Sequence, residues 1–294
     1  MTMVPEDIIK KIKRIHIKGS RTVNTLMAGQ YRSVFRGSGI EFEEVREYSP
    51  GDDVKAIDWK VSARLGRPFI KLYREERESI VILLVDMSAS QRFGTFSGLK
   101  LEKAAEAASV LAFSAIKNND KVGAIFFTDQ VEKYIPPKKG SSHIWRLIRE
   151  IFTFEPQGRG TDIRAALEYL STVSRKKTLA FIISDFIAPD VAKGLRTARH
   201  RHELIGAIIS DPGELNLPSR GIVSMAGFET GEKWILDAGD PQVRQRYIHW
   251  KKSQLADIET ALTWARVDYF HMPTDQSVAD VLTLFFRQRE KRMR

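Results

Sequence analysis

A run of apolar residues that ends in oxygen-bearing side chains constrains the fold of this chain more than any other feature. Residues 81–85, Val-Ile-Leu-Leu-Val, are all apolar, without alternation. This pattern is typical of a strand that is covered on both faces, as in a parallel sheet. Asp86, Ser88 and Ser90 follow at every second position, so a turning loop would bring one carboxylate and two hydroxyls to one point. Such oxygens suit a hard cation such as Mg²⁺, although the same residues also serve to cap a turn.

Strands and helices alternate along most of the remaining sequence. Beyond the strand at 80–85, strands are expected at 121–128, 131–135, 179–184, 204–210 and 267–272. Helices are expected at 99–117, 141–152, 162–173, 191–200, 241–265 and 277–289. The short turn at Asp129-Gln130 makes the strand at 131–135 an antiparallel edge. This order predicts an α/β fold with a doubly wound, mainly parallel sheet.

Helix caps can be predicted at two of these boundaries. Ser141 or Ser142 is placed to cap the helix that runs through Phe152, and Thr161 is the natural N-cap of the helix at 162–173. The segment before Thr161, Pro-Gln-Gly-Arg-Gly at 156–160, is a glycine-rich loop.

Two segments do not fit the α/β alternation. Residues 1–78 are expected to form an N-terminal part with an amphipathic helix from Pro5 to His16 and a small β-subdomain. Residues 79–294 form the α/β domain, with a β-hairpin insertion at about 212–238. Because a lone pair of strands is marginal in water, we expect the strands at 40–48 and 69–73 to join the hairpin at 222–237 in one subdomain.

Charged residues are interleaved with aromatic ones between 39 and 76. They have two interpretations, a recognition face or an internal network of ion pairs. We favour the network, because basic and acidic residues occur in like numbers beside Tyr48 and Trp59. Its expected members are Arg46, Arg64, Arg74 and Arg77 with Glu47, Asp52, Asp53 and Asp58.

Composition narrows the class of protein. The absence of Cys excludes disulfides, thiolate zinc sites and cysteine nucleophiles. No apolar run reaches the ~20 residues that span a bilayer, and the first 18 residues carry charges throughout, so a cytoplasmic protein without a transmembrane segment is expected. Seven of the ten excess positive charges lie in residues 1–20 and 287–294. Such basic ends are usually solvated, so no nucleic acid is expected, although anionic lipid or an acidic partner stays an alternative.

Three segments that are distant in sequence should meet at one edge of the sheet. Asp86, Ser88 and Ser90 follow the first core strand, Thr161 opens a helix, and Asp185 ends the strand at 179–184. Ligands of open α/β sheets bind at the carboxyl ends of strands where the strand order reverses. Two carboxylates and three hydroxyls at this edge predict a magnesium site with few charged ligands.

These five residues resemble the metal-ion-dependent adhesion site (MIDAS) of the von Willebrand factor A (vWA) domain. That site is Asp-x-Ser-x-Ser, then a Thr, then an Asp, and all five positions match. The resemblance implies that the hydroxyls of Ser88, Ser90 and Thr161 touch Mg²⁺, with Mn²⁺ as an alternative. It also implies that Asp86 and Asp185 hold the metal directly or through water, and that an acidic residue of a partner protein takes the open position.

A second resemblance covers nearly the full length. Phe35-Arg-Gly-Ser-Gly-Ile-Glu-Phe-Glu-Glu-Val-Arg-Glu-Tyr, Pro50-Gly-Asp-Asp-Val and Ile57-Asp-Trp, followed by Ala63-Arg and Glu75-Glu-Arg, resemble the signature of the bacterial "domain of unknown function fifty-eight" (DUF58) family. Members are commonly encoded beside MoxR-type AAA+ ATPases. The resemblance therefore implies an adaptor or co-chaperone-like partner of such an ATPase, and not an enzyme.

A magnesium-dependent phosphohydrolase is the alternative from another class. Such enzymes also place an Asp after the first strand, but they need a second carboxylate two residues on, where this chain has Ser88. No glycine-rich nucleotide-binding motif follows the first strand. The six His residues are scattered, so we expect structural or surface roles for them, and we expect the five Trp residues in the core.

Overall fold

The computed structural model describes residues 10, 14–15, 41–74, 79–95, 98–215, 217–229 and 231–293 of the 294-residue chain. The expected helix from Pro5 to His16 lies mostly outside this part, although Lys10, Arg14 and Ile15 are helical. The chain divides into two compact units, one of which is Phe35–Ser79. The division expected from the sequence placed residues 1–78 in the first part.

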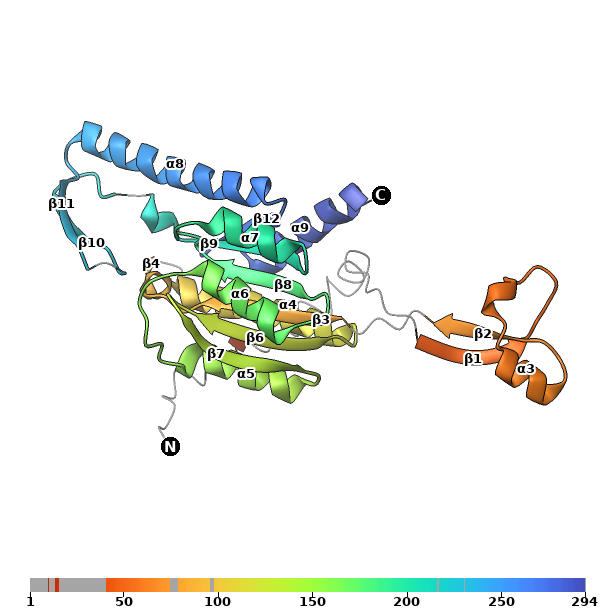
Figure 1. Ribbon diagram of the computed structural model, residues 1–294. Helices are drawn as coiled ribbons and strands as arrows, with labels where there is room; N and C mark the ends of the chain where they lie inside the picture. Colours follow the sequence, from red (N-terminus) through yellow and green to blue (C-terminus); the bar gives the residue numbers. More distant parts are fainter. Residues whose placement is uncertain are drawn as a thin grey trace. The chain divides into compact units, whose positions relative to one another are not determined.

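One six-stranded sheet forms the centre of the α/β unit (Figure 1). Neighbouring strands of this sheet run parallel to each other, except for one antiparallel pair at an edge of the sheet. The apolar side chains of the central strands are buried, as their unbroken apolar runs predict. The predicted doubly wound, mainly parallel α/β fold is therefore confirmed. The strand order is β12 (Asp268–Pro273), β9 (Glu203–Ser210), β8 (Leu179–Ser184), β3 (Ile80–Asp86), β6 (Lys121–Phe127) and β7 (Val131–Lys138).

Helices cover both faces of this sheet. On one face α6 (Ile163–Val173), α7 (Val191–Arg199) and α8 (Pro241–Trp264) pack in succession against each other and the strands. On the other face lie α4 (Lys100–Lys117), α5 (Ser141–Thr153) and α9 (Val278–Met293). The alanines of α4 are fully buried, which lets this helix lie close to the strands. None of the described helices has the length and apolar character needed to cross a membrane.

The strand order reverses between β3 and β8. From β3 the chain passes through α4 to β6 on one side, whereas β8 lies on the other side and leads on to β9 and β12. At such a switch point the loops that follow the two strands diverge and leave a crevice at the carboxyl edge of the sheet. The loops after Asp86 and Ser184 border this crevice.

Strand β7 closes one edge of the sheet. It pairs antiparallel with β6, as the short turn at Asp129-Gln130 predicts. The pairing is irregular, because Val122 lies opposite Lys138 while Ala124 lies opposite Ile135. Pro136 and Pro137 fall within this shift, and proline is tolerated there because an edge strand need not donate every N–H.

The remaining strands form separate hairpins, so their expected pairing into one subdomain is wrong for the part of the chain that is described. β1 (Glu41–Glu47) pairs with β2 (Phe69–Arg74), and β10 (Ile222–Ala226) pairs with β11 (Lys233–Asp237). The hairpin at 222–237 was correctly predicted, and it does not extend the six-stranded sheet.

Ion pairs and caps hold the Phe35–Ser79 unit together. Arg46 binds Asp52 with two hydrogen bonds of 2.6 and 2.9 Å, and Lys71 lies 3.3 Å from Asp58. Asp53 and Asp58 also cap the short helices η2 (Val54–Ala56) and α3 (Trp59–Leu65). The expected network is therefore present in part, with two of its acids used as helix caps.

Most tryptophans are not in the core, contrary to expectation. Trp59, Trp234, Trp250 and Trp264 are about half exposed or more, and Trp145 is intermediate. Basic side chains cover two of the rings, since the Arg196 guanidinium lies 4.7 Å from the centroid of Trp264 and the Lys251 ammonium 5.2 Å from that of Trp250. Such cation–π contacts stabilise aromatic rings at the surface.

The helix caps differ from the predicted ones. Asp162, not Thr161, is the N-cap of α6, and its carboxylate accepts a hydrogen bond from the Ala165 N–H. α5 starts after Gly140 without a side-chain cap. The side chain of Thr161 is therefore available for other contacts.

We expect Asp162→Ala to lower the free energy of unfolding by about 1 kcal/mol, because the N-terminal N–H groups of α6 lose their side-chain acceptor. Asp162→Asn is the matched control, since asparagine caps as well as aspartate. Urea unfolding of the full chain measures both. An equal loss of unfolding free energy in the two variants would contradict the assignment of Asp162 as the N-cap.

His202 predicts a pH dependence of stability. The ring is buried, neither nitrogen has a hydrogen-bond partner in the described part of the chain, and burial followed by the charge of Arg201 lowers its pKa. The unfolded chain therefore takes up this proton at a higher pH than the folded chain does. The free energy of unfolding should fall as the pH falls through 6.5 and level off below the folded pKa.

His202→Leu should reduce this slope in urea unfolding measured across the acidic range. His200→Asn is the control, because it removes an exposed imidazole close by in sequence. An unchanged slope in His202→Leu would show that other groups cause it.

Candidate metal centre

The pairing of β3 with β8 sets the position of the first aspartate. Val85 lies opposite Ile183, so Asp86 emerges beside Ser184. The Ser184 hydroxyl donates to Asp86 Oδ2 at 2.5 Å, and the Ser88 N–H donates to Asp86 Oδ1 at 2.8 Å. Asp86 is fully buried, and this burial, followed by repulsion from Asp185, raises its pKa to about 7.

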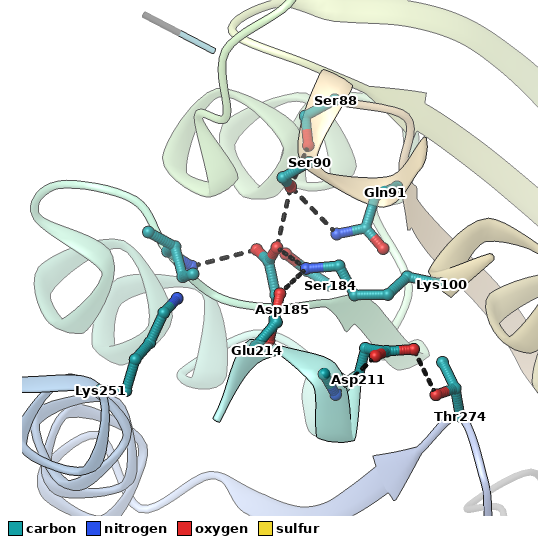
Figure 2. Close-up of polar contacts among 12 residues, drawn as sticks. Ser88, Ser90, Gln91, Lys100, Ser184, Asp185, Asp211, Glu214, Lys251 and Thr274 are labelled. Carbon is teal, nitrogen blue, oxygen red and sulfur yellow. Dashed lines mark hydrogen bonds and ion pairs between the residues drawn. The ribbon is translucent and has the colours of Figure 1, made fainter. Parts of the chain in front are cut away.

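The serine hydroxyls bridge the two aspartates. The Oγ atoms of Ser88 and Ser90 lie 3.0 Å apart, and Ser90 donates to Asp185 Oδ2 at 2.8 Å (Figure 2). Ser88 is the N-cap of the 3₁₀ helix η3 (Ala89–Arg92), which turns the chain so that Ser90 faces the crevice. The Ser88 side chain makes no capping hydrogen bond to this helix, so the turn-capping role considered from the sequence falls to Asp86, which accepts from the Ser88 N–H.

A buried lysine contacts the second aspartate. Lys100 Nζ donates to Asp185 Oδ2 and to Glu214 Oε1, both at 2.8 Å (Figure 2). The Lys100 side chain is 1% exposed. Although burial opposes it, the charges of Asp185 and Glu214 raise the pKa of this lysine, so it stays cationic. The sequence analysis missed Lys100 and Glu214, which carry no motif.

An unusual backbone conformation turns the chain immediately after Asp185. Phe186 has a φ of 60°, in the left-handed region that costs a non-glycine residue roughly 1–2 kcal/mol. Its ring is buried, and its N–H donates to the Ser184 hydroxyl at 3.0 Å. Packing thus holds a turn that the backbone alone disfavours, as is common at functional sites.

Hydrogen bonds fix the loop that carries Thr161. The N–H groups of Gln157 and Gly158 donate to Glu132, and the Asp162 N–H donates to the Thr128 carbonyl at 2.8 Å. The approach is close at Gly158, where an added Cβ would lie 1.9 Å from Asp129 Oδ1. A glycine is therefore required there, which accounts for part of the glycine-rich sequence before Thr161.

The Thr161 hydroxyl contacts a residue that sequence reasoning missed. It donates to Glu229 Oε1 at 2.7 Å, across 68 positions of sequence. Glu229 lies in the turn between β10 and β11. Burial raises its pKa, the Thr161 and Ser88 hydroxyls act against this rise, and the charge of Asp185 adds to it. Glu229 therefore belongs to the same cluster as the predicted site.

Another aspartate at the same sheet edge has a different role. Asp211 follows β9, and its carboxylate accepts from the hydroxyls of Thr95 at 2.6 Å and Thr274 at 2.7 Å and from two backbone N–H groups. These bonds join the loops after three strands, so Asp211 is structural. A cleft of about 280 Å³ lies between Asp185, Asp211, Lys251 and the apolar Ile258 of α8.

The five predicted residues thus lie in one cluster. Direct hydrogen bonds link Asp86 to Ser88, Ser88 to Ser90, and Ser90 to Asp185. Thr161 joins them through Glu229, which also interacts with Ser88. No group of three His, Cys, Asp or Glu side chains with metal-binding geometry occurs among the described residues, so hydroxyls are needed to complete a site here.

The residues fit a hard divalent cation on two observations. The Ser88–Ser90 and Ser90–Asp185 oxygen pairs are hydrogen-bonded at 3.0 and 2.8 Å, which brings hydroxyl and carboxylate oxygens from two loops close enough to share one ion with ~2.1 Å metal–oxygen bonds. In addition, the buried Gln91 Oε1 has no hydrogen-bond partner in the described structure, while Gln91 Nε2 points at Asp86. The described residues therefore supply no donor for this buried oxygen.

The buried ion triad of Lys100 gives a stability prediction. Lys100→Met should lower the free energy of unfolding by about 3–5 kcal/mol, because Asp185 and Glu214 would lose the ammonium that bonds both of them and keep only the more distant charge of Lys251. The second change Glu214→Gln should recover part of this loss, because it removes one of the unpaired charges. Urea unfolding in EDTA measures both, and a Lys100→Met variant as stable as the parent would contradict the pairing.

Comparisons with known proteins agree with this architecture. The uncharacterized protein Rv1480 of Mycobacterium tuberculosis is 28% identical over 275 residues, which cover 92% of this chain and 86% of the relative. The YeaD protein of Bacillus subtilis is 26% identical over 148 residues, which cover 50% of this chain and 35% of YeaD.

Among solved structures, an aerotolerance-related membrane protein from Bacteroides fragilis is similar in fold. Its TM-score is 0.50 at 16% identity, and the match covers 73% of this chain and 100% of that one. The VWA domain of SpRpn10 also matches, with a TM-score of 0.40 at 11% identity over 69% of this chain and 93% of its own.

The family model for DUF58, a protein of unknown function, matches residues 44–257. This range covers most of the chain and includes all five predicted site residues together with Lys100, Glu214 and Glu229. The resemblance drawn from the sequence is confirmed, and this chain belongs to the DUF58 family.

Proposed function

We propose that this protein is a metal-ion-dependent binding module for other proteins. In this proposal Asp86, Ser88, Ser90, Thr161 and Asp185 hold one Mg²⁺, or Mn²⁺, at the switch point of the sheet. The observation that carries the proposal is the convergence of these side chains from three separate loops, with oxygen separations of 2.8–3.0 Å between serines and aspartate. The metal would supply an electrophilic coordination position for a partner's carboxylate.

The charges around the site favour an acidic partner group. With Glu229 of the hairpin left out of the count, three carboxylates, those of Asp86, Asp185 and Glu214, stand against the ammonium groups of Lys100 and Lys251, both of which interact with Asp185. The balance is one negative charge, and a divalent cation changes it to one positive charge. A carboxylate would neutralise that charge at the metal, whereas a neutral group has to compete with water.

The cleft beside Asp185 supports docking of a protein segment. Its walls combine Lys251 with apolar side chains such as Ile187, Ile208 and Ile258. A segment that places an acidic residue on the metal could lay neighbouring apolar residues in this cleft. By family resemblance we infer a MoxR-type AAA+ ATPase as this partner, with the charged 39–76 region as a second contact.

The site chemistry favours binding over catalysis. A phosphohydrolase would need an acid–base group two residues after Asp86, and Ser88 is instead engaged with Ser90. Each carboxylate near Asp86 has a hydrogen-bonded partner: Asp185 binds Lys100 and Ser90, and Glu229 binds Thr161. We therefore propose a non-catalytic role.

We expect titration calorimetry to detect Mg²⁺ binding that Asp86→Asn and the double variant Ser90→Ala/Thr161→Val abolish, because the first removes a negative charge and the second removes two hydroxyls that would hold the metal. Asp211→Asn is the matched control. It changes an aspartate at the same sheet edge whose carboxylate already has four hydrogen-bond donors. It should bind Mg²⁺ as the parent does, with circular dichroism to verify that all variants are folded.

A pull-down with the candidate ATPase extends this test. Recovery should fall on addition of EDTA and with Asp86→Asn, and it should be retained with Asp211→Asn. Recovery that is indifferent to both EDTA and Asp86→Asn would place the contact elsewhere. Absence of Mg²⁺ binding by the folded parent would refute the metal site itself.

A further inference from the structure

The turn of the inserted hairpin is attached to the loops of the candidate metal site. Phe228 packs on Phe93, with ring centroids 5.7 Å apart, and Phe93 is the C-cap residue of η3, which carries Ser90. The next residue, Glu229, accepts the hydrogen bond from Thr161. Two successive residues of the turn therefore contact two of the three loops that form the site.

The rest of the hairpin has little support of its own. β10 and β11 form a two-stranded sheet, and most of their residues are exposed, including Ile222 and Ile235 at 77% and 75%. An isolated two-stranded hairpin is marginally stable in water. The contacts at its turn and the hydrogen bonds from Arg244 to the Ser219 and Ala238 carbonyls near its base are thus the described interactions that hold it.

Glu229 has the chemistry of the ligand that the proposed site would take. It is a carboxylate, it is half-buried, and it reaches the cluster through the hydroxyls of Thr161 and Ser88. The Thr161 Oγ1–Glu229 Oε1 distance of 2.7 Å is close to the ~3.0 Å expected of neighbouring ligands in an octahedral shell. Its charge would also bring the positive balance of the metal-loaded site to zero.

We propose that Glu229 is a ligand of the same metal ion, supplied by the hairpin of its own chain, and that it occupies the position that a partner carboxylate takes. This inference rests on the proposed metal site. Docking of an acidic partner then requires Glu229 to leave the metal and the hairpin turn to move. The hairpin therefore competes with partners for the metal. A partner must bind strongly enough to displace Glu229.

The test compares the parent with Glu229→Gln and Glu229→Ala in the full chain. Glu232→Gln is the matched control, because it removes a carboxylate from an exposed position three residues away in the same turn. Calorimetry measures Mg²⁺ affinity, and hydrogen–deuterium exchange measures the protection of residues 222–237 with and without Mg²⁺.

In the parent and in Glu232→Gln, Mg²⁺ should slow exchange in the hairpin. In both Glu229 variants this protection should disappear, and Mg²⁺ affinity should fall about tenfold or more, the range seen even for outer-shell partners of metal sites. Equal affinity and equal hairpin protection in parent and Glu229 variants would overturn the inference and leave the five-residue site standing. No Mg²⁺ binding by the parent would overturn the proposed function together with it.

Competition with an external carboxylate is tested with Mn²⁺ and carbon-13 acetate. Acetate bound to the paramagnetic ion broadens its own resonance. Broadening should be stronger with Glu229→Ala than with the parent or with Glu232→Gln, because the internal ligand no longer blocks the position. Equal broadening in all three proteins would refute the claim that Glu229 and a partner compete for one position.

Discussion

The site depends on a repulsion that the sheet itself creates. Burial of β3 and β8 fixes their parallel register, and this register delivers Asp86 and Asp185 to the same point of a water-poor edge. Like charges at such a point raise each other's free energy. Neighbouring groups lower this free energy, because Ser184 donates a hydrogen bond to Asp86 and Lys100 donates one to Asp185. In our proposal, a divalent cation would complete this compensation.

The sequence predicted the sheet and the meeting of five polar side chains at its edge because both follow from local patterns, namely unbroken apolar runs and polar residues at strand ends. It did not predict Lys100 and Glu229, since their roles depend on contacts across 85 and 68 positions. The cap of α6 was misassigned because Thr161 and Asp162 are adjacent and both of a type that favours N-cap positions; Asp162 caps the helix, and Thr161 contacts the distant Glu229 instead. The tryptophans were misplaced because cation–π contacts on α8 cannot be recognised from spacing.

The contacts at the site are made by residues within the range that matches the DUF58 family model. In this chain the matched range extends from the Phe35–Ser79 unit through the inserted hairpin into α8, and it includes Lys251, which borders the cleft. In our proposals these parts act together: the hydroxyl loops hold the metal, Lys100 limits the negative charge around it, and the hairpin decides whether the coordination position is open.

The edge strand β7 affects how a partner protein can approach the six-stranded sheet. An edge strand is normally open to addition of a further strand, which is a common route to both peptide recognition and unwanted aggregation. Pro136 and Pro137 have no N–H that could donate to an added strand, and the irregular pairing beside them disrupts the hydrogen-bonding pattern that such a strand needs. Over that stretch the edge is therefore blunted against β-augmentation. In our proposals, recognition at this sheet relies instead on side chains at its carboxyl end, where a metal and a single competing carboxylate would regulate affinity.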